Sequence, residues 1–182
     1  AGLEPFGDDG SFLQTFPLVR TTLIVDSAEF ALVGAGGSTA RRLVPGDDFQ
    51  VRGYDDTGFD VTAPVVFVGH GLVDEESAVD DYAGLDVEGK FVLVLDGLPT
   101  ERSDLRRAAS WRRKQMFAEE RGAAGLITVM DEALGTSDRF RDYVRSAMQR
   151  GSISLGGGVE GDEATFPRAY VERAVASTLL SV

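Results

Sequence analysis

The sequence contains no cysteine, which excludes disulfide bonds and every reaction that needs a thiolate. It contains one histidine, His70, so these 182 residues cannot assemble a zinc site from the usual His and Cys ligands. A Ser–His–Asp triad would need His70 as its base, and no Gly-x-Ser-x-Gly turn is present to expose a serine. Lysine is scarce: of the 18 basic residues only Lys90 and Lys114 are lysine, and the others are arginine.

Long apolar runs are absent as well. No run approaches the roughly 20 residues of a transmembrane helix, and the amino terminus lacks the basic and apolar regions of a signal peptide. The chain opens on Ala-Gly-Leu without Met, which we interpret as an excised or processed piece of a longer protein. A hydrophobic content of 43% and a charged content of 26% are typical of a soluble globular protein, and the length suits one domain, or one domain with an appendage.

The net charge of −12 is concentrated in the first half of the chain. Residues 1–90 hold 17 acids and 5 bases, whereas residues 91–182 hold 13 of each. Such a surface repels phosphate backbones, so a nucleic-acid partner is not expected. An acidic face also favours cationic partners, although acidity commonly serves solubility alone.

Short apolar runs between turns predict a series of strands. Residues 64–68 and 91–95 lack the alternation of a half-exposed strand, so we expect both to be buried on both faces. Residues 30–33 and 40–44 flank a Gly-rich segment and predict a β-hairpin. Further strands are predicted at residues 19–25, 49–51, 59–61, 124–130 and 166–169.

A period of about 3.6 residues begins after Pro99. It predicts a helix with Ser103 as its N-cap and Gly122 as its left-handed C-terminal residue. The expected buried stripe of this helix is Leu105, Ala108, Ala109, Met116 and Phe117. A strand, this helix and a further strand in succession predict a right-handed parallel crossover. Two more helices are predicted at residues 137–150 and 171–180, with a mobile Gly-rich loop at residues 156–158.

Candidate chemistry is sparse. His70 lies between two glycines after a predicted buried strand, where ligand-facing residues occur, but we interpret it as a strand-end histidine with ordinary hydrogen bonds. Gly34, Gly36 and Gly37 precede a predicted strand rather than a helix, which excludes a dinucleotide fingerprint. No pair of carboxylates stands out among the 30 acids as a glycosidase pair.

Two acidic clusters suggest calcium, but their spacing does not match an EF-hand loop, and we interpret both as solvated loops. The clusters are Asp55, Asp56 and Asp60, and Asp74, Glu75, Glu76, Asp80 and Asp81. A basic run on the predicted helix consists of Arg106, Arg107, Arg112, Arg113 and Lys114. It could bind an anion or an acidic partner, but we interpret it as a solvated face, with Trp111 as its exposed contact.

Five segments, taken in order, resemble a known family. They are FVGHGL from Phe67, DDYAGLDVEGK from Asp80, FVLVLDGLP from Phe91, ERGAAGLITV from Glu120 and FPRAYVERAVASTLL from Phe166. The series is similar to the protease-associated (PA) domain inserted in zinc-dependent aminopeptidases related to glutamate carboxypeptidase and the transferrin receptor. Residues 1–18 are similar to the segment that leads from the peptidase domain into the insert.

The resemblance implies an α/β (α+β) fold: a three-layer swivelling β/β/α domain. Its central sheet would be partly parallel, with an antiparallel β layer and two to three helices. The expected organisation is a lead-in at residues 1–18 and a PA domain at residues 19–182. His70 stands where the resemblance would place a tyrosine. The family's metal ligands belong to the peptidase domain, so this chain is expected to hold no catalytic, metal-binding or cofactor residue, and no binding residue is assigned.

The implied function is a non-catalytic domain of a larger zinc aminopeptidase, which shapes substrate access beside the metallopeptidase site. The expected partners are the parent peptidase domain and peptide substrates, with no nucleic acid and no membrane span. The expected location is secreted or periplasmic. Two alternatives stay open: a stand-alone binding module from a catalytically inactive peptidase homologue, and a small enzyme that works with carboxylates alone.

Overall fold

The computed structural model describes residues 2–22, 27–34, 36–52, 59–99, 101–130, 150–155 and 166–180, with Asp138, Arg141, Asp142 and Ser146. Its strands are β1 (Leu18–Thr21), β2 (Phe30–Val33), β3 (Thr39–Leu43), β4 (Phe49–Arg52), β5 (Val65–Phe67), β6 (Val73–Asp74), β7 (Val79–Asp80), β8 (Phe91–Leu95), β9 (Gly125–Val129), β10 (Ser152–Leu155) and β11 (Arg168–Val171). Its helices are the α-helices α1 (Trp111–Glu120) and α3 (Arg173–Leu179) and the 3-10 helices η1 (Asp8–Gly10) and η3 (Ser103–Arg106).

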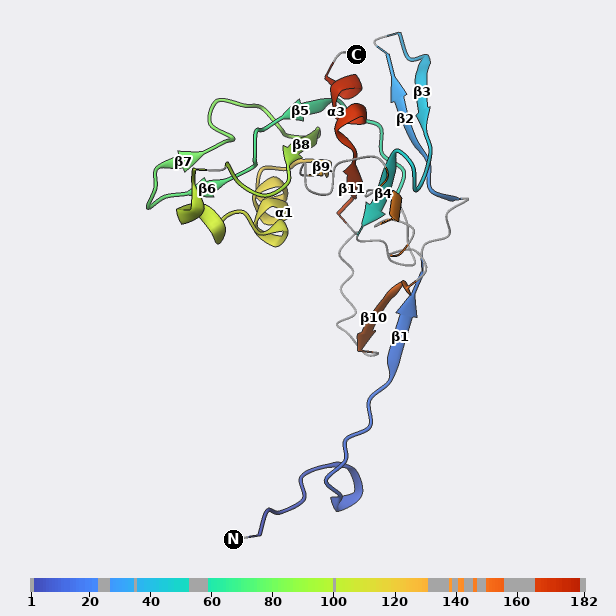
Figure 1. Cartoon of the computed structure of the whole chain (residues 1–182), viewed down its shortest axis with the longest axis vertical. Helices are drawn as coiled ribbons and strands as arrows, with labels where there is room; N and C mark the ends of the chain where they lie inside the picture. The colour runs from blue at the N-terminus through green and yellow to red at the C-terminus, as the bar shows by residue number, and fades with distance from the viewer. Residues whose placement is uncertain are drawn as a thin grey trace.

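A five-stranded mixed sheet forms the centre of the domain, in the order β4-β11-β9-β8-β5 (Figure 1). The pairs β5–β8, β8–β9 and β9–β11 are parallel, and β4 joins β11 antiparallel at one edge. The connection from β8 to β9 runs through α1, as the strand–helix–strand pattern predicted.

Helix α1 covers one face of this sheet. Alternate residues of β8, Val92 and Val94, point into a cluster with Leu126 of β9 and Phe117 of α1. Val92 and Val94 are completely buried. This packing explains half of the apolar run in β8, since these alternate positions serve one face only.

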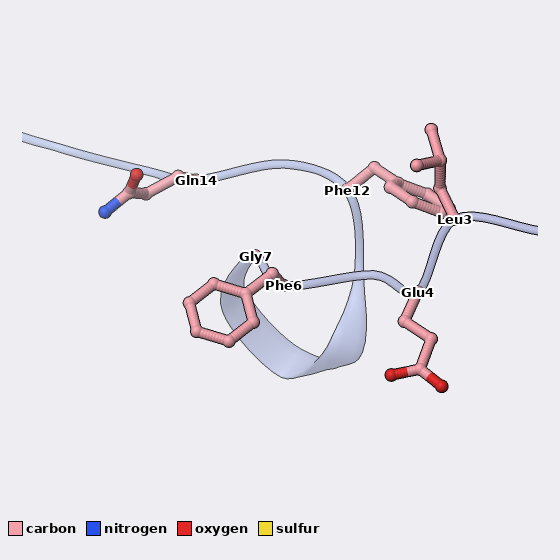
Figure 2. Close-up of a pocket in the computed structure, with 6 residues that line it drawn as sticks. All are labelled: Leu3, Glu4, Phe6, Gly7, Phe12 and Gln14. Carbon is pink, nitrogen blue, oxygen red and sulfur yellow. The ribbon is translucent and has the colours of Figure 1, made fainter.

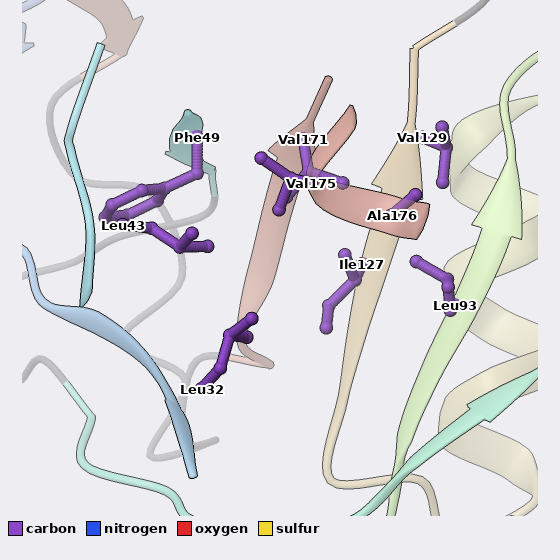
Figure 3. Close-up of a cluster of buried hydrophobic side chains, with 9 residues drawn as sticks. All are labelled: Leu32, Leu43, Phe49, Leu93, Ile127, Val129, Val171, Val175 and Ala176. Carbon is purple, nitrogen blue, oxygen red and sulfur yellow. The ribbon is translucent and has the colours of Figure 1, made fainter. Parts of the chain in front are cut away.

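The β2–β3 hairpin and α3 cover the opposite face (Figure 3). Leu93 and Ile127 project from the sheet toward Leu32 of the hairpin and Val175 of α3. Because both faces of β8 are covered, its side chains need not alternate between apolar and polar. The layers are therefore α1, the mixed sheet, and a third layer of hairpin and helix.

An extended arm, residues 2–17, precedes β1 and projects away from the sheet (Figure 1). It closes one small loop at η1, where Thr15 N–H donates to Asp8 Oδ2 at 2.7 Å. Figure 2 shows an open hollow that is lined only by arm residues, among them Leu3 and Phe12. Leu3 is 88% exposed and Phe12 is 69% exposed, so the arm has no core of its own.

Most predicted strands are confirmed, including the β2–β3 hairpin and the buried run in β8. The prediction that residues 64–68 form a strand buried on both faces is wrong. Strand β5 is an edge strand, and Phe67 is 42% exposed. The strand predicted at residues 59–61 is also wrong, since these residues have no regular secondary structure. The apolar run alone did not reveal which strand lies at an edge, because that depends on pairing.

The helix predicted from Ser103 is interrupted. Ser103 begins the 3-10 helix η3, and α1 starts only after Ser110. The predicted end is confirmed: Gly122 has φ +70°, and it donates to Glu119 O while Ala123 donates to Ala118 O. These two bonds form a Schellman motif. Within the predicted stripe, Leu105, Ala108 and Phe117 are buried and Ala109 is half-buried, but Met116 is 38% exposed.

Toward the carboxyl terminus the boundaries shift by a few residues. The strand predicted at residues 166–169 is β11, and the helix predicted from residue 171 is α3, which begins at Arg173 because Val171 belongs to the strand. The predicted helix at residues 137–150 lies largely outside the described residues. The five of its residues that the structure describes are helical: Asp138, Arg141, Asp142, Ser146 and Arg150. Residues 156–158 lie outside the described residues.

The predicted fold class is confirmed, since the described residues form a mixed central sheet, antiparallel strands and the α-helices α1 and α3. Strand β1 begins at Leu18 and pairs with β10, so one ribbon spans the predicted boundary between lead-in and domain. That boundary stays a prediction. Within the described ranges, no helix has the length and apolar character needed to cross a membrane.

Candidate functional site

Polar side chains gather at the carboxyl ends of β5 and β8. His70 belongs to the turn that follows β5, and Asp96 and Gly97 follow β8. The two segments are joined by a hydrogen bond of 2.8 Å from Leu95 N–H to Gly69 O. Open α/β sheets bind their ligands beyond the carboxyl ends of the strands, so this region is the first candidate for a site.

Lys114 is the charged residue buried at this edge. Its side chain extends from α1 and is only 2% exposed, and its Nζ donates to Leu95 O and Gly97 O, both at 2.8 Å. Burial lowers its pKa to about 8, while the charges of Asp96 and Asp81 oppose that shift. The prediction that Lys114 belongs to a solvated basic face is therefore wrong. A sequence signal existed, because Phe117 and Ala118 lie three and four positions later, on the same helix face.

Asp81 holds the turn that carries His70. Its Oδ2 accepts hydrogen bonds from the backbone N–H groups of His70 at 3.1 Å and Leu72 at 2.9 Å. Asp81 was predicted to lie in a solvated loop, but it is half-buried and has this structural role. Glu75 and Glu76 of the same cluster are exposed, as predicted.

Two further acids of that cluster also cap local turns. Asp74 Oδ2 accepts a hydrogen bond from Ser77 N–H at 3.0 Å, and Asp80 Oδ1 accepts one from Tyr82 N–H at 3.0 Å. Asp80 is exposed and lies 3.8 Å from the guanidinium of Arg121. These carboxylates stabilise turns, and their oxygens do not converge on a common point.

The pKa of His70 is lowered in the folded protein. Burial is the main cause, and the nearby charge of Lys114 adds to it, while the charge of Asp81 and hydrogen bonding to the backbone of Gly97 and Asp96 raise this pKa. Nδ1 is buried and has no hydrogen-bond partner among the described residues. The expected ordinary hydrogen bonding therefore holds for the backbone of His70 but not for Nδ1.

The glycine after His70 permits this close packing. A Cβ on Gly71 would lie 2.7 Å from Val94 Cγ1 and 3.6 Å from Tyr82 Oη, and its φ is +65°. Burial raises the pKa of Tyr82 to about 12, and its ring lies 4.6 Å from the guanidinium carbon of Arg121. The edge is thus filled by packed side chains.

This arrangement has the features of a structural anchor. Lys114 is satisfied by two carbonyl oxygens, and no serine is paired with His70 within the part of the chain described. Over the same residues, no group of three His, Cys, Asp or Glu side chains is placed to hold a metal ion. Of the first acidic cluster, Asp55 and Asp56 lie outside the described residues and Asp60 is exposed. Gly34 and Gly37 form the tip of the β2–β3 hairpin, so they open no helix.

The rest of the basic run lies on the surface, as predicted. Arg106, Arg107, Arg112 and Arg113 are exposed, and Trp111 is 46% exposed. The Trp111 ring lies 4.5 Å from the guanidinium carbon of Arg168 on β11 and 5.2 Å from that of Arg112. Sequence reasoning missed Arg168, because the parallel pairing of β11 brings it to Trp111 from a distant part of the chain.

Apolar side chains are exposed along the arm and the β1–β10 ribbon. Leu13 is 77% exposed, Leu18 is 62% exposed and Ile153 of β10 is 59% exposed. A two-stranded ribbon is marginally stable alone in water, and large exposed apolar areas mark interaction sites. This surface, like the one around Trp111, is a candidate for a contact with another protein.

Comparison with known proteins identifies the domain. The sequence matches the PA domain over residues 61–179, about two thirds of the chain. No curated protein matches it significantly. The match begins after β4, although β4 pairs with β11 inside the same sheet, so the structural unit extends beyond the matched residues. The chain therefore belongs to the PA domain family, the protease-associated domains, which are themselves non-catalytic and usually lie within peptidases.

Proposed function

We propose that this chain is the PA domain of a larger zinc aminopeptidase, exported to the periplasm or secreted. There it forms a wall beside the metallopeptidase site and limits which peptides reach the metal. The observation that carries the proposal is the PA domain match over residues 61–179, combined with the order of the resembling segments.

The exposed apolar arm supports the proposal. Leu3, Phe6 and Phe12 are each more than two thirds exposed, which is costly for side chains of this size in water. A peptidase domain in contact with the arm and the ribbon would remove these side chains from solvent. The arm would then act as the joint between the two domains.

The zinc ion would be held outside this chain. One histidine and no cysteine, with no metal-binding group among the described residues, do not fit a zinc site. The contribution of this domain is therefore steric and electrostatic. It acts on substrate binding rather than on the chemical step.

The test is to replace residues 19–182, the whole predicted PA domain, in the parent protein with a short Gly/Ser linker. We expect KM and the preference for peptide length to change, with little change in kcat for the smallest substrate. Zinc content and kcat for that substrate serve as controls for folding of the peptidase domain. Unchanged kinetics for every peptide, in a protein that remains folded, would contradict the gating role.

A second outcome points to the alternative function. If the coding sequence beyond Val182 lacks a set of metal ligands and the purified parent binds no zinc, the parent is an inactive homologue. The domain would then be a binding module in its own right. Peptidase assays on the isolated chain, with and without zinc, check the remaining possibility of an enzyme within these residues.

A further inference from the structure

One segment of the chain carries a charge opposite to that of the whole protein. Residues 102–118 contain six basic residues and one acidic residue, within a chain whose net charge is −12. Lys114 is buried, but the arginines at positions 106, 107, 112 and 113 are exposed. These four arginines and Trp111 are called here the Arg–Trp surface.

The arginines of this surface differ from those elsewhere in their pairing. Arg41 pairs with Asp48 at 2.8 Å, and Arg102 pairs with Asp104 at 2.9 Å. Within the described residues, no ion pair with a carboxylate is formed by Arg106, Arg107, Arg112 or Arg113. The guanidinium groups of the Arg–Trp surface therefore have no carboxylate partner in the part of the chain that the structure describes, although the protein has an excess of acids.

Aromatic rings hold two of these arginines in place. The guanidinium carbon of Arg112 lies 5.2 Å from the Trp111 ring, and that of Arg113 lies 5.2 Å from the Phe117 ring. The guanidinium carbon of Arg168, a residue of strand β11, lies 4.5 Å from the Trp111 ring. This contact holds the ring against the sheet. Rings that restrict long side chains reduce the entropy lost on binding.

We propose that the Arg–Trp surface binds a carboxylate-rich polypeptide segment. A guanidinium group matches the two oxygens of a carboxylate in a bidentate arrangement, and each exposed arginine of the Arg–Trp surface offers one such fork. Half-exposed Trp111 provides a flat apolar platform for the peptide backbone between the acids. Tryptophan and arginine are also the residues that contribute most at protein interfaces.

Charge complementarity favours an acidic polypeptide over a nucleic acid. The 17 acids in residues 1–90 repel a long polyanion with regularly spaced phosphates. A short acidic peptide can remain within the Arg–Trp surface and avoid these acids. The proposal depends on the geometry of α1 and not on the identity of the parent protein.

The experiment uses the single tryptophan of the chain as its reporter, because all tryptophan fluorescence then originates from Trp111. The purified chain is titrated with a short peptide of alternating Glu and Ala, which contains no aromatic residue. We expect a saturable change in fluorescence that weakens as salt is added, and no change with the matching Gln–Ala peptide. Calorimetry checks the same binding without the fluorophore.

Matched variants localise the binding. Arg112→Gln with Arg113→Gln is expected to weaken binding of the Glu–Ala peptide roughly tenfold, because charge-assisted hydrogen bonds are lost. The control, Arg41→Gln with Arg42→Gln, removes the same charge from the adjacent pair on β3 and is expected to leave binding unchanged. Circular dichroism confirms that each variant is folded.

Three results would overturn the proposal. The first is no saturable binding of the Glu–Ala peptide to the folded chain. The second is equal weakening by the β3 pair and the α1 pair, which would indicate a general effect of charge. The third is tighter binding of an oligothymidylate of equal charge, which would indicate a nucleic-acid surface.

Discussion

The Nζ atom of Lys114 lies 2.8 Å from the carbonyl oxygen of Leu95, the last residue of β8. A second bond of the same length joins Nζ to Gly97 O. One side chain from α1 therefore fixes the backbone that leaves β8, the neighbour of the central strand β9. Near the same strand end, Val94 packs in one apolar cluster with Phe117 of α1. Polar and apolar contacts therefore hold the helix to this end of β8.

Replacing this lysine tests the anchor. Lys114→Met is expected to lower the free energy of unfolding by about 1–3 kcal/mol at neutral pH, because two part-buried carbonyl oxygens lose their donor. Denaturant unfolding followed by circular dichroism measures the change. The control is Lys90→Met at the other lysine, which forms an exposed pair with Asp86 and is expected to have little effect. Equal effects of the two substitutions would contradict the anchoring role.

The lowered pKa of Lys114 predicts a rise in stability with alkaline pH. Its pKa is about 8 in the folded protein and 10.5 for an ordinary, solvated lysine, so the unfolded chain binds more protons between these values. Unfolding free energy should therefore increase between pH 8 and pH 10, by about 2 kcal/mol relative to Lys114→Met. The window ends near pH 10, because the raised pKa of Tyr82 has the opposite effect above it. Parallel pH curves for the two proteins would contradict this prediction.

His70 predicts a separate dependence at acidic pH. Its pKa is lowered in the folded protein, so the unfolded chain takes up a proton first as pH falls below 6.5. The wild-type protein should lose stability on acidification, and His70→Gln should lose less. Because His70 is the only histidine, the difference between the two curves isolates its contribution. Identical curves from pH 7 to pH 5 would show that the imidazole is as solvated in the folded state as in the unfolded state.

Gly71 tests the close packing at the strand edge. Gly71→Ala is expected to destabilise the protein by about 1–3 kcal/mol. The new methyl group overlaps Val94, and the backbone of the alanine must keep a positive φ. The matched control is Gly84→Ala, where φ is +76° but no atom lies within 4 Å of the added Cβ. That substitution is expected to cost about 1 kcal/mol from backbone strain alone. Unfolding midpoints of the two variants separate overlap from strain, and a smaller effect at Gly71 would contradict the packing argument.

Local patterns in the sequence were sufficient for much of the fold. The hairpin, the buried run of β8 and the left-handed end of α1 at Gly122 follow from residue types and their spacing. The same patterns did not predict that β5 is an edge strand, because a short apolar run occurs both in central strands and in edge strands. They also failed for Met116, which lies on the predicted stripe but faces solvent because the helix starts later than expected.

The sequence also predicted that this chain holds no catalytic set, because one histidine and no cysteine leave few ways to build one, and this stays a prediction. The roles of Asp81 and Lys114 were not evident. Both appeared within charged stretches that normally indicate solvated surfaces, and only the burial of their neighbours gave them backbone partners. A charged residue is interpreted correctly only when the groups that surround it are known.

Composition and spacing by themselves determined a cysteine-free α/β domain with covered central strands, since side-chain periodicity is a local property of the chain. Tertiary structure alone decided which strand lies at the edge, where Lys114 donates its hydrogen bonds, and how Arg168 reaches Trp111. These are contacts between segments far apart in sequence, and their energies depend on burial and distance. Neither quantity exists until the chain has folded.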